Sequence, residues 1–259
     1  NMMIYKSPSA ELPADFSGGF VRVMTKNIPD GNTFNVSYQM GFNTNATFRN
    51  FQLTDGTAKD YLGFGADVRN LPSSFPAHLG EHSTDEAAAF TRQINQRWGI
   101  NKFTAIPDQK ISLTSHRSYD VGGWKIGNIT NLNWSTEFDY SETVNNNYIA
   151  YDVKNDVSRP RFEYNDIRYK NTSKLGALFN WSFQRDGSKY ELRNFFSQRG
   201  VSALTQREGM NYYSDKDIRK WESLYTGRTT YSGQISGVHT LRENQQGGLD
   251  GGLCLRLLP

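Results

Sequence analysis

Residues 34–42 read Phe-Asn-Val-Ser-Tyr-Gln-Met-Gly-Phe, a strict alternation of apolar residues with polar or small ones. Because successive side chains of a β-strand point to opposite faces, this stretch presents one apolar face and one polar face. Similar alternation returns further along the chain, at residues 111–119, 125–141, 175–183, 190–199 and 221–235. The pattern predicts an all-β fold of antiparallel strands.

The connections between these strands alternate between short and long. Gly122-Gly123 separates one pair of predicted strands, and Asp186-Gly187 separates the next pair. Asp-Gly is typical of a two-residue hairpin turn, in which both central residues take positive φ. The other ends carry polar segments that we expect to be long loops, at residues 52–108, 142–158 and 202–219.

One part of the first polar segment has a helical period instead. Phe90, Ile94 and Trp98 recur at a spacing of four residues, and Thr84 stands where an N-terminal cap is expected. We therefore expect a helix over residues 85–98. Its apolar stripe is interpreted as packing within the loop.

The same segment contains a candidate metal pair. His78 and His82 have the spacing that places two ligands on one face of a helix, with Glu81 and Asp85 close by. A proline and a glycine nearby argue against a helix there. These residues are therefore interpreted as a polar loop, and we expect no bound metal or other cofactor.

Composition narrows the possible partners and environments. The chain of 259 residues carries 29 Lys and Arg against 26 Asp and Glu, a net charge of +3, so nucleic acid is not an expected partner. The single cysteine, Cys254, excludes a disulfide framework and a multi-cysteine zinc site. No apolar run approaches the roughly 18 residues that a membrane-spanning helix needs, whereas transmembrane β-strands alternate and remain compatible with this sequence.

Strand length and side-chain chemistry distinguish a transmembrane barrel from a soluble sandwich. Sandwich strands usually run about 5–6 residues and membrane strands about 9–11, and several predicted strands reach about ten. Aromatic residues lie near the ends of the apolar faces, as in the girdles of membrane barrels: Trp124, Tyr140, Tyr190, Trp221 and Tyr225. The opposite faces carry charges at Glu137, Asp139, Arg193 and Arg228. The pattern favours the barrel and leaves the soluble sheet as an alternative.

A more specific pattern stands at the amino end. Residues 6–26 read Lys-Ser-Pro-Ser-Ala-Glu-Leu-Pro-Ala-Asp-Phe-Ser-Gly-Gly-Phe-Val-Arg-Val-Met-Thr-Lys, with a glycine pair at Gly18 and Gly19 and a closing Thr25-Lys26. This stretch resembles the end of the plug domain of TonB-dependent outer-membrane receptors. Residues 60–72, Asp-Tyr-Leu-Gly-Phe-Gly-Ala-Asp-Val-Arg-Asn-Leu-Pro, resemble the first-loop segment of the receptor branch that includes starch-utilisation transporters.

The resemblance implies an antiparallel up-and-down transmembrane β-barrel, present in part as about six or seven strands, with the last strand of a plug domain at the amino end. It assigns residues 1–31 to the end of the plug domain and residues 32–246 to the first part of the barrel. Receptors of this kind have about 22 strands, so we interpret the chain as a fragment.

The carboxy-terminal residues 247–259 read Gly-Gly-Leu-Asp-Gly-Gly-Leu-Cys-Leu-Arg-Leu-Leu-Pro and lack an alternating face. Codons for this tail can be read in another frame as a further alternating strand. We therefore hypothesise a frameshift in the source DNA. Resequencing that encodes the same tail in frame with a long downstream barrel would contradict it.

The resemblance also implies import of a nutrient, such as a glycan, a peptide or a siderophore, across a Gram-negative outer membrane, without enzymatic activity. Expected partners are TonB with its inner-membrane energising complex, reached through a missing amino-terminal segment, outer-membrane lipid, and a surface substrate-binding lipoprotein. Substrate contacts in the lumen or loops are expected at Glu137, Asp139, Arg193, Tyr212 and Tyr213. The alternatives are a soluble carbohydrate-binding module and a glycoside hydrolase, which needs two carboxylates across a cleft.

Overall fold

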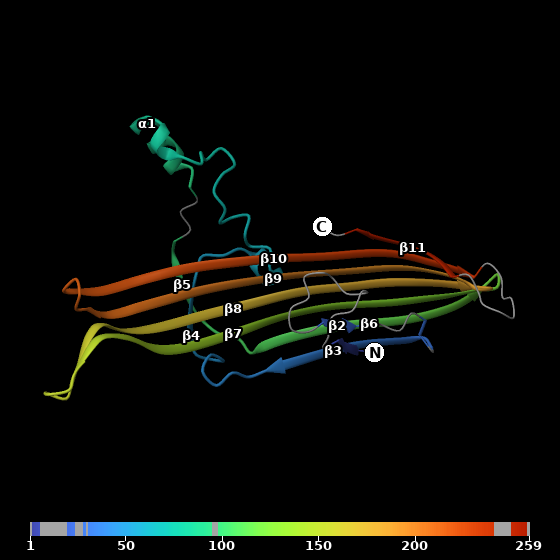
Figure 1. Cartoon of the computed structure of the whole chain (residues 1–259), viewed down its shortest axis with the longest axis horizontal. Helices are drawn as coiled ribbons and strands as arrows, with labels where there is room; N and C mark the ends of the chain where they lie inside the picture. Colours follow the sequence, from blue (N-terminus) through green and yellow to red (C-terminus); the bar gives the residue numbers. More distant parts are fainter. Residues whose placement is uncertain are drawn as a thin grey trace.

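The computed structural model describes residues 2–5, 20–23, 28–29, 31–94, 98–240 and 250–257. Its main feature is one seven-stranded antiparallel sheet with the strand order β11-β10-β9-β8-β7-β6-β3 (Figure 1). The strands are β3 (Thr33–Gly41), β6 (Asp108–Val121), β7 (Trp124–Asp152), β8 (Val157–Arg185), β9 (Ser188–Asn211), β10 (Lys216–Thr240) and β11 (Asp250–Leu257). The predicted antiparallel β fold is confirmed. Among the described residues the sheet is open, with β3 and β11 as its edges.

The two short turns are formed as expected. Gly122 and Gly123 have φ of 58° and 80°, and Asp186 and Gly187 have φ of 43° and 77°. Positive φ at both central residues gives the turn a twist that matches the flanking strands. These turns join β6 to β7 and β8 to β9 in tight hairpins, and both turns lie at the same end of the sheet (Figure 1).

The prediction of long loops at residues 142–158 and 202–219 is wrong. β7 and β8 each span 29 residues, so only residues 153–156 lie between them. Likewise only residues 212–215 separate β9 from β10. Backbone pairing continues through these polar rows because charged cross-strand neighbours stabilise them, such as Arg207 with Asp166 at 2.6 Å. Apolar side chains such as Val144, Tyr148 and Ile149 stand in these rows without the regular alternation by which strands are recognised.

Residues 42–107, here called the excursion segment, form the one long insertion between two neighbouring strands of the main sheet. The segment contains a two-stranded sheet of β4 (Asn50–Thr54) and β5 (Ile100–Thr104), the 3₁₀ turns η1 (Ala58–Leu62) and η2 (Leu79–Glu81), and the helix α1 (Thr84–Arg92). In Figure 1, α1 projects away from the sheet. β4 and η1 both contact β8 and β9. None of the described helices is long and apolar enough to cross a membrane.

The helix begins close to its expected position but is shorter than predicted. Its cap is Ser83 rather than Thr84: the Ser83 hydroxyl accepts from the backbone N of Glu86, and the Glu86 carboxylate accepts from the backbone N of Ser83. At the other end, the N–H groups of Gln93 and Ile94 bond to carbonyls three residues back. This tighter last turn ends the α-helical period at Arg92.

Two predicted regions lie partly or wholly outside the described residues. The plug-end residues Gly18, Gly19, Thr25 and Lys26 are outside them, although β1 (Met2–Tyr5) and β2 (Phe20–Val23) form a two-stranded antiparallel sheet. Within the tail, residues 250–257 form β11 and pair with β10 despite the absence of an alternating face.

The register divides the main sheet into two chemically different faces. Directly opposite residues of antiparallel strands share a face. Trp181 of β8 has Asn128 of β7 and Leu192 of β9 as its cross-strand neighbours, and Leu192 in turn lies opposite Ile235 of β10. The face of the sheet that carries these residues is called the apolar face, and the face that carries Glu137 and Asp139 is called the charged face.

The apolar face is exposed over one part of its length and covered over the next. Most rows between Trp124 and Trp134 carry exposed apolar side chains, although Arg117 lies on the same face, opposite Asn128. The exposed apolar side chains of these rows, here called the apolar band, are Phe34, Val36, Tyr38, Ile111, Tyr119, Val121, Leu132, Phe179, Tyr190, Tyr231 and Ile235. Beyond Trp134 the excursion segment packs on the same face. The buried cluster formed there is Ala46, Phe51, Ala105, Phe138 and Tyr169.

Candidate functional site

The carboxylates singled out from the sequence are ion-paired on the charged face. Glu137 lies 3.0 Å from Lys174 and Asp139 lies 2.7 Å from Lys170, and both lysines belong to β8. The two carboxylates are therefore neutralised across the strand pair.

Ion pairs continue along the charged face of β7 to β10. Arg193 lies 2.7 Å from Glu191, which Lys189 also contacts at 2.7 Å. Asp166 and Glu222 are held by Arg207 and Lys220, respectively. Every carboxylate that these four strands place on the charged face between Lys125 and Asn145 has a cation partner: Glu137, Asp139, Asp166, Glu191 and Glu222.

The same face carries a row of cations that sequence reasoning did not single out. Lys174 lies opposite Arg199, and Arg199 lies opposite Arg228. Within the described chain neither arginine has a carboxylate within the 4.0 Å of an ion pair. Like charges directly opposite one another repel, and Glu137 offsets the charge of this row only at Lys174. Spacing along one strand does not reveal it, because the row depends on the register of three strands.

The remaining predicted contacts lie far from this row. Tyr212 and Tyr213 stand in the β9–β10 turn, 47% and 76% exposed. The Tyr212 hydroxyl donates to Glu163 at 2.9 Å, and the guanidinium of Arg161 lies 5.2 Å from the Tyr213 ring centre. Arg193 lies opposite Asn180 of β8, which lies opposite Ile129 of β7. Along β7, Ile129 is about 26 Å from Glu137 at roughly 3.3 Å per residue. The structure therefore distributes the predicted contacts along the sheet instead of gathering them into one pocket.

The excursion segment is fastened to the apolar face by the motif at residues 60–72. The Gly63 carbonyl accepts from Gln198 Nε2 at 2.5 Å, and the Gly65 N–H donates to the Tyr225 hydroxyl at 2.7 Å. Trp134 Nε1 donates to the Tyr61 carbonyl at 2.6 Å. Backbone groups of this motif are thus satisfied by side chains of three different strands.

An internal ion pair keeps the motif in shape. Arg69 donates to both carboxylate oxygens of Asp60, at 3.0 and 2.6 Å, and its guanidinium lies 4.4 Å from the Tyr225 ring centre.

Two exposed carboxylates of the excursion segment have lowered pKa values. A hydrogen bond from Lys59 lowers the pKa of Asp67. In α1, the bond from the Ser83 backbone lowers the pKa of Glu86. Both carboxylates therefore stay ionised at neutral pH.

Close approach at two glycines makes this fastening possible, and it yields a test. Gly63 has a φ of 83°, and a Cβ on Gly200 would lie 2.6 Å from both Gly63 Cα and the Tyr225 hydroxyl. We expect Gly200→Ala to cost about 1–3 kcal/mol of the docking free energy, measured by limited proteolysis of the excursion segment. Gly227→Ala is the matched control, because Gly227 lies directly opposite Gly200 and its Cβ would meet nothing closer than 3.5 Å. Equal protection of the two variants would contradict the steric argument.

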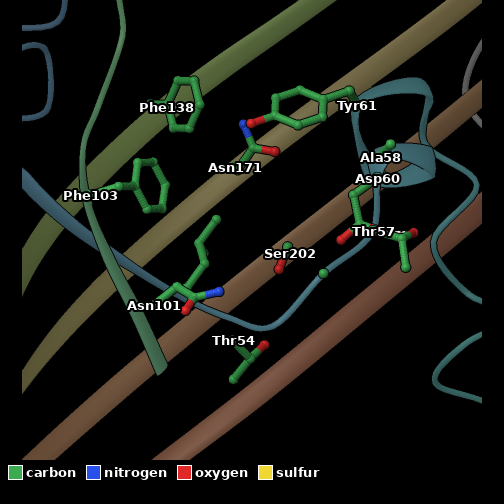
Figure 2. A pocket seen from close by; sticks show the side chains of 12 residues that line it. Thr54, Thr57, Ala58, Asp60, Tyr61, Asn101, Phe103, Phe138, Asn171 and Ser202 are labelled. Atoms are coloured by element: carbon green, nitrogen blue, oxygen red, sulfur yellow. Dashed lines mark hydrogen bonds between the residues drawn. The ribbon is translucent and has the colours of Figure 1, made fainter. Parts of the chain in front are cut away.

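A cavity of about 290 Å³ lies between the excursion segment and the apolar face. Figure 2 shows Phe103 and Phe138 on one side of it, with Asn171 and Ser202 on the strands beneath and Asp60 across from them. Its lining is Leu53, Thr54, Gly56, Thr57, Ala58, Asp60, Tyr61, Asn101, Phe103, Phe138, Asn171 and Ser202. No sequence signal indicated it, because its walls come from segments more than a hundred residues apart.

The histidine pair does not form a metal centre in the described chain. His78 occupies the N-cap position of η2 but makes no side-chain capping hydrogen bond. The His82 ring centre lies 5.2 Å from that of Phe90, and His82 Nδ1 lies 3.8 Å from Glu86 Oε2. Among the described side chains, no group of three or more His, Cys, Asp or Glu lies close enough to hold a metal ion. The interpretation as a polar loop agrees with the 3₁₀ turn found there.

Comparisons with protein-family models, with curated proteins and with solved structures give no match to this chain. Its function is therefore inferred from the geometry described above.

Proposed function

We propose that the chain is part of an outer-membrane β-barrel of the TonB-dependent receptor class that imports a nutrient. The observation that carries this proposal is the apolar band: a row of large apolar side chains, uncovered by other described residues, on one face of a sheet whose other face is charged. A soluble sheet would bury such a band under a second layer. In a barrel the band faces lipid and the charged face lines a wet interior.

The height of the band supports this proposal. From Trp124 to Trp134, β7 advances about ten residues, or about 33 Å along the strand at roughly 3.3 Å per residue. At the roughly 45° tilt of barrel strands this corresponds to about 23 Å, close to the about 25 Å apolar belt of outer-membrane barrels. Trp124 and Trp134 mark the two ends, as girdle aromatics do. Beyond Trp134 the docked excursion segment, including the Tyr61 carbonyl bound by Trp134, limits the band.

The charged face supplies the path for a solute in this proposal. Its ion pairs, including that of Lys174 with Glu137, leave the wall without a large net field, and Arg199 and Arg228 draw anionic groups of the solute inward. The β7–β8 and β9–β10 hairpins extend beyond the band (Figure 1), where exposed side chains such as Tyr213 can meet substrate.

The mechanism follows from the resemblance of residues 6–26 and 60–72. Substrate binds at the hairpin tips and the plug, TonB pulls on the plug with energy from its inner-membrane complex, and the plug rearranges to open the path. Outer-membrane lipid surrounds the band, and a surface lipoprotein delivers substrate. No covalent step is required.

Depth-dependent quenching of tryptophan fluorescence tests this proposal. Trp181 lies in the row of Asn128, near the middle of the band, whereas Trp124 and Trp134 lie at its ends. Variants that keep one tryptophan are placed in vesicles whose acyl chains carry bromine at a shallow or a deep carbon. We expect deep bromines to quench Trp181 more strongly, and shallow bromines to quench Trp124 and Trp134.

Trp98 is the control, because it lies on the excursion segment and is 70% exposed. It is expected to escape quenching by either lipid. Equal quenching of Trp181 and Trp98 would contradict the proposed placement of the apolar band in lipid.

A further inference from the structure

The apolar face changes its chemistry in the row nearest the two tight turns. In that row Arg185 of β8 lies opposite Ser188 of β9, and Ser188 lies opposite His239 of β10. Arg185 is four residues from Trp181 on the same strand, so this row belongs to the apolar face. Arg185, Ser188 and His239 are here called the border row, because they adjoin the apolar band where the strands turn back.

The Ser188–His239 pair keeps one hydrogen-bond donor for a ligand. Ser188 Oγ lies 2.5 Å from His239 Nδ1, and neither side chain has another hydrogen-bond partner in the described chain. If the hydroxyl donates, the neutral imidazole carries its proton on Nε2, and if Nδ1–H donates, the hydroxyl proton stays available. In both tautomers one donor is therefore left, which suits a ligand that accepts hydrogen bonds.

Arg185 adds a positive charge to the border row. Its Nε lies 3.3 Å from the Asp186 carboxylate, which is 88% exposed, and its guanidinium carbon lies 5.9 Å from the Trp124 ring centre. An ion pair with so exposed a partner contributes little and is screened by salt. The two terminal nitrogens of Arg185 keep the fork of N–H donors that matches two phosphate oxygens.

Arg117 is a second cation on this face. It lies opposite Asn128, which is four residues from Trp124 and six from Trp134 along β7. Within the described chain no carboxylate lies within the 4.0 Å of an ion pair with Arg117. A long cationic side chain on a lipid-facing surface extends towards the nearer headgroups. Arg117 therefore adds positive potential at the same end of the apolar band.

Aromatic side chains continue from the border row into the apolar band. Tyr190 lies opposite Phe183 in the next row, and the ring centre of Tyr190 lies 6.2 Å from that of Trp124. The Phe183 ring in turn stacks on that of Trp181, with 6.1 Å between their centres. A ligand that contacts both regions needs a phosphate at one end and long apolar chains at the other.

We propose that the border row binds the phosphate of an anionic phospholipid whose acyl chains lie on the adjoining aromatic side chains. The inference rests on the proposed function, because the chains reach this place only if the apolar band faces a bilayer. A zwitterionic lipid would bring its ammonium group next to Arg117 and Arg185, whereas phosphatidylglycerol brings negative charge alone. The site therefore prefers phosphatidylglycerol to phosphatidylcholine.

Quenching by brominated lipids measures this preference. A full-chain variant that keeps Trp124 alone is placed in phosphatidylcholine vesicles with a small share of brominated phosphatidylglycerol, or with the same share of brominated phosphatidylcholine. We expect the anionic lipid to occupy the place beside Trp124 about five times more often, as one surface cation would produce. A variant that keeps Trp134 alone, at the other end of the band, is expected to show no preference.

Arg185→Gln is expected to abolish the preference at Trp124, and Lys125→Gln is the matched control. Lys125 adjoins Trp124 in the chain and is exposed like Arg185, but it points to the charged face, opposite Gln184. General attraction between cations and an anionic vesicle acts on both residues, whereas the proposed site contains only Arg185. Both variants are expected to unfold at the same urea concentration as the parent. Equal preferences in the two variants would overturn the proposal.

The Ser188–His239 pair is tested by removing both members, because either one alone can still donate. The double variant Ser188→Ala and His239→Phe is expected to lower the preference at least about twofold, through the loss of one hydrogen bond to a charged group. An unchanged preference would overturn the border row as the binding site.

A further arm separates a lipid headgroup from free phosphate. Inorganic phosphate and sodium chloride, added at equal ionic strength, are expected to lower the preference equally, through screening alone. A larger loss with phosphate would assign the site to the free ion and overturn the lipid assignment.

Trp181 separates failure of this site from failure of the proposed function. If deep bromines quench Trp181 but Trp124 shows no preference, the headgroup site is wrong and the placement of the apolar band in lipid stands. If Trp181 is not quenched, the placement fails and the headgroup site fails with it.

Discussion

Replacement of Phe51 by alanine is expected to release the excursion segment from the sheet, at a cost of about 3–5 kcal/mol. Phe51 is 0% exposed, and its ring centre lies 5.2 Å from that of Tyr169, 5.4 Å from that of Phe138 and 5.6 Å from that of Phe103. Its side chain therefore joins β4 and β5 to β7 and β8. Truncation removes these contacts and leaves a hole that the flat strands beneath cannot fill.

Limited proteolysis measures this release. Cleavage within residues 64–94 of Phe51→Ala is expected to be at least about a hundredfold faster than in the parent, since about 1.4 kcal/mol corresponds to a factor of ten. Phe48→Ala is the control: it makes the same chemical change in the same segment, at a side chain that is 68% exposed. If both variants were cleaved at the parent's rate, Phe51 would not anchor the segment.

Phe179→Arg is the second substitution with a large expected effect. Phe179 lies in the row of Thr130, in the middle of the apolar band, and is 45% exposed. In a barrel with this band in lipid, an arginine at mid-depth is expected to cost about 2–4 kcal/mol of unfolding free energy. An ordinary exposed surface position would tolerate the same change within about 0.5 kcal/mol.

The adjacent Leu178 supplies the control, because it points to the charged face of the same strand. Urea titrations of Phe179→Arg and Leu178→Arg in phosphatidylcholine vesicles compare the two faces directly. We expect the loss to be confined to Phe179→Arg. Equal losses, or a larger loss for Leu178→Arg, would remove the distinction between a lipid face and a wet face on which the proposed function depends.

Local patterns in the sequence were sufficient to predict where the strands of the main sheet lie and where their tight turns form. Alternation over residues 34–42 corresponds to β3, and Asp186-Gly187 forms the expected turn with positive φ. The extension of β7 to Asp152 was not predictable in this way. The outer rows that β8 shares with β9 carry cross-strand partners such as Asp166 and Arg207. A single strand does not reveal which residues will be opposite each other.

The candidate site was less accessible to sequence reasoning than the fold. Glu137 and Asp139 were correctly expected to share one face, because they are two residues apart on a strand. Their lysine partners, and the opposition of Arg199 and Arg228, depend on register. The docking of residues 60–72 on β9 and β10 joins segments more than a hundred residues apart, so no local pattern carried it.

The irregular register at Asn147 and Tyr148 has a consequence for access from outside. A bulge bends its strand and increases its twist. In Figure 1 the tip of the β7–β8 hairpin turns away from the tip of β9–β10, so the two hairpins diverge beyond the last row that they share. In the proposed barrel the rim is therefore flared and notched at this place. In that barrel a bulky substrate would enter from the side, through the gap between the two hairpins and outside the bilayer, instead of along the central axis.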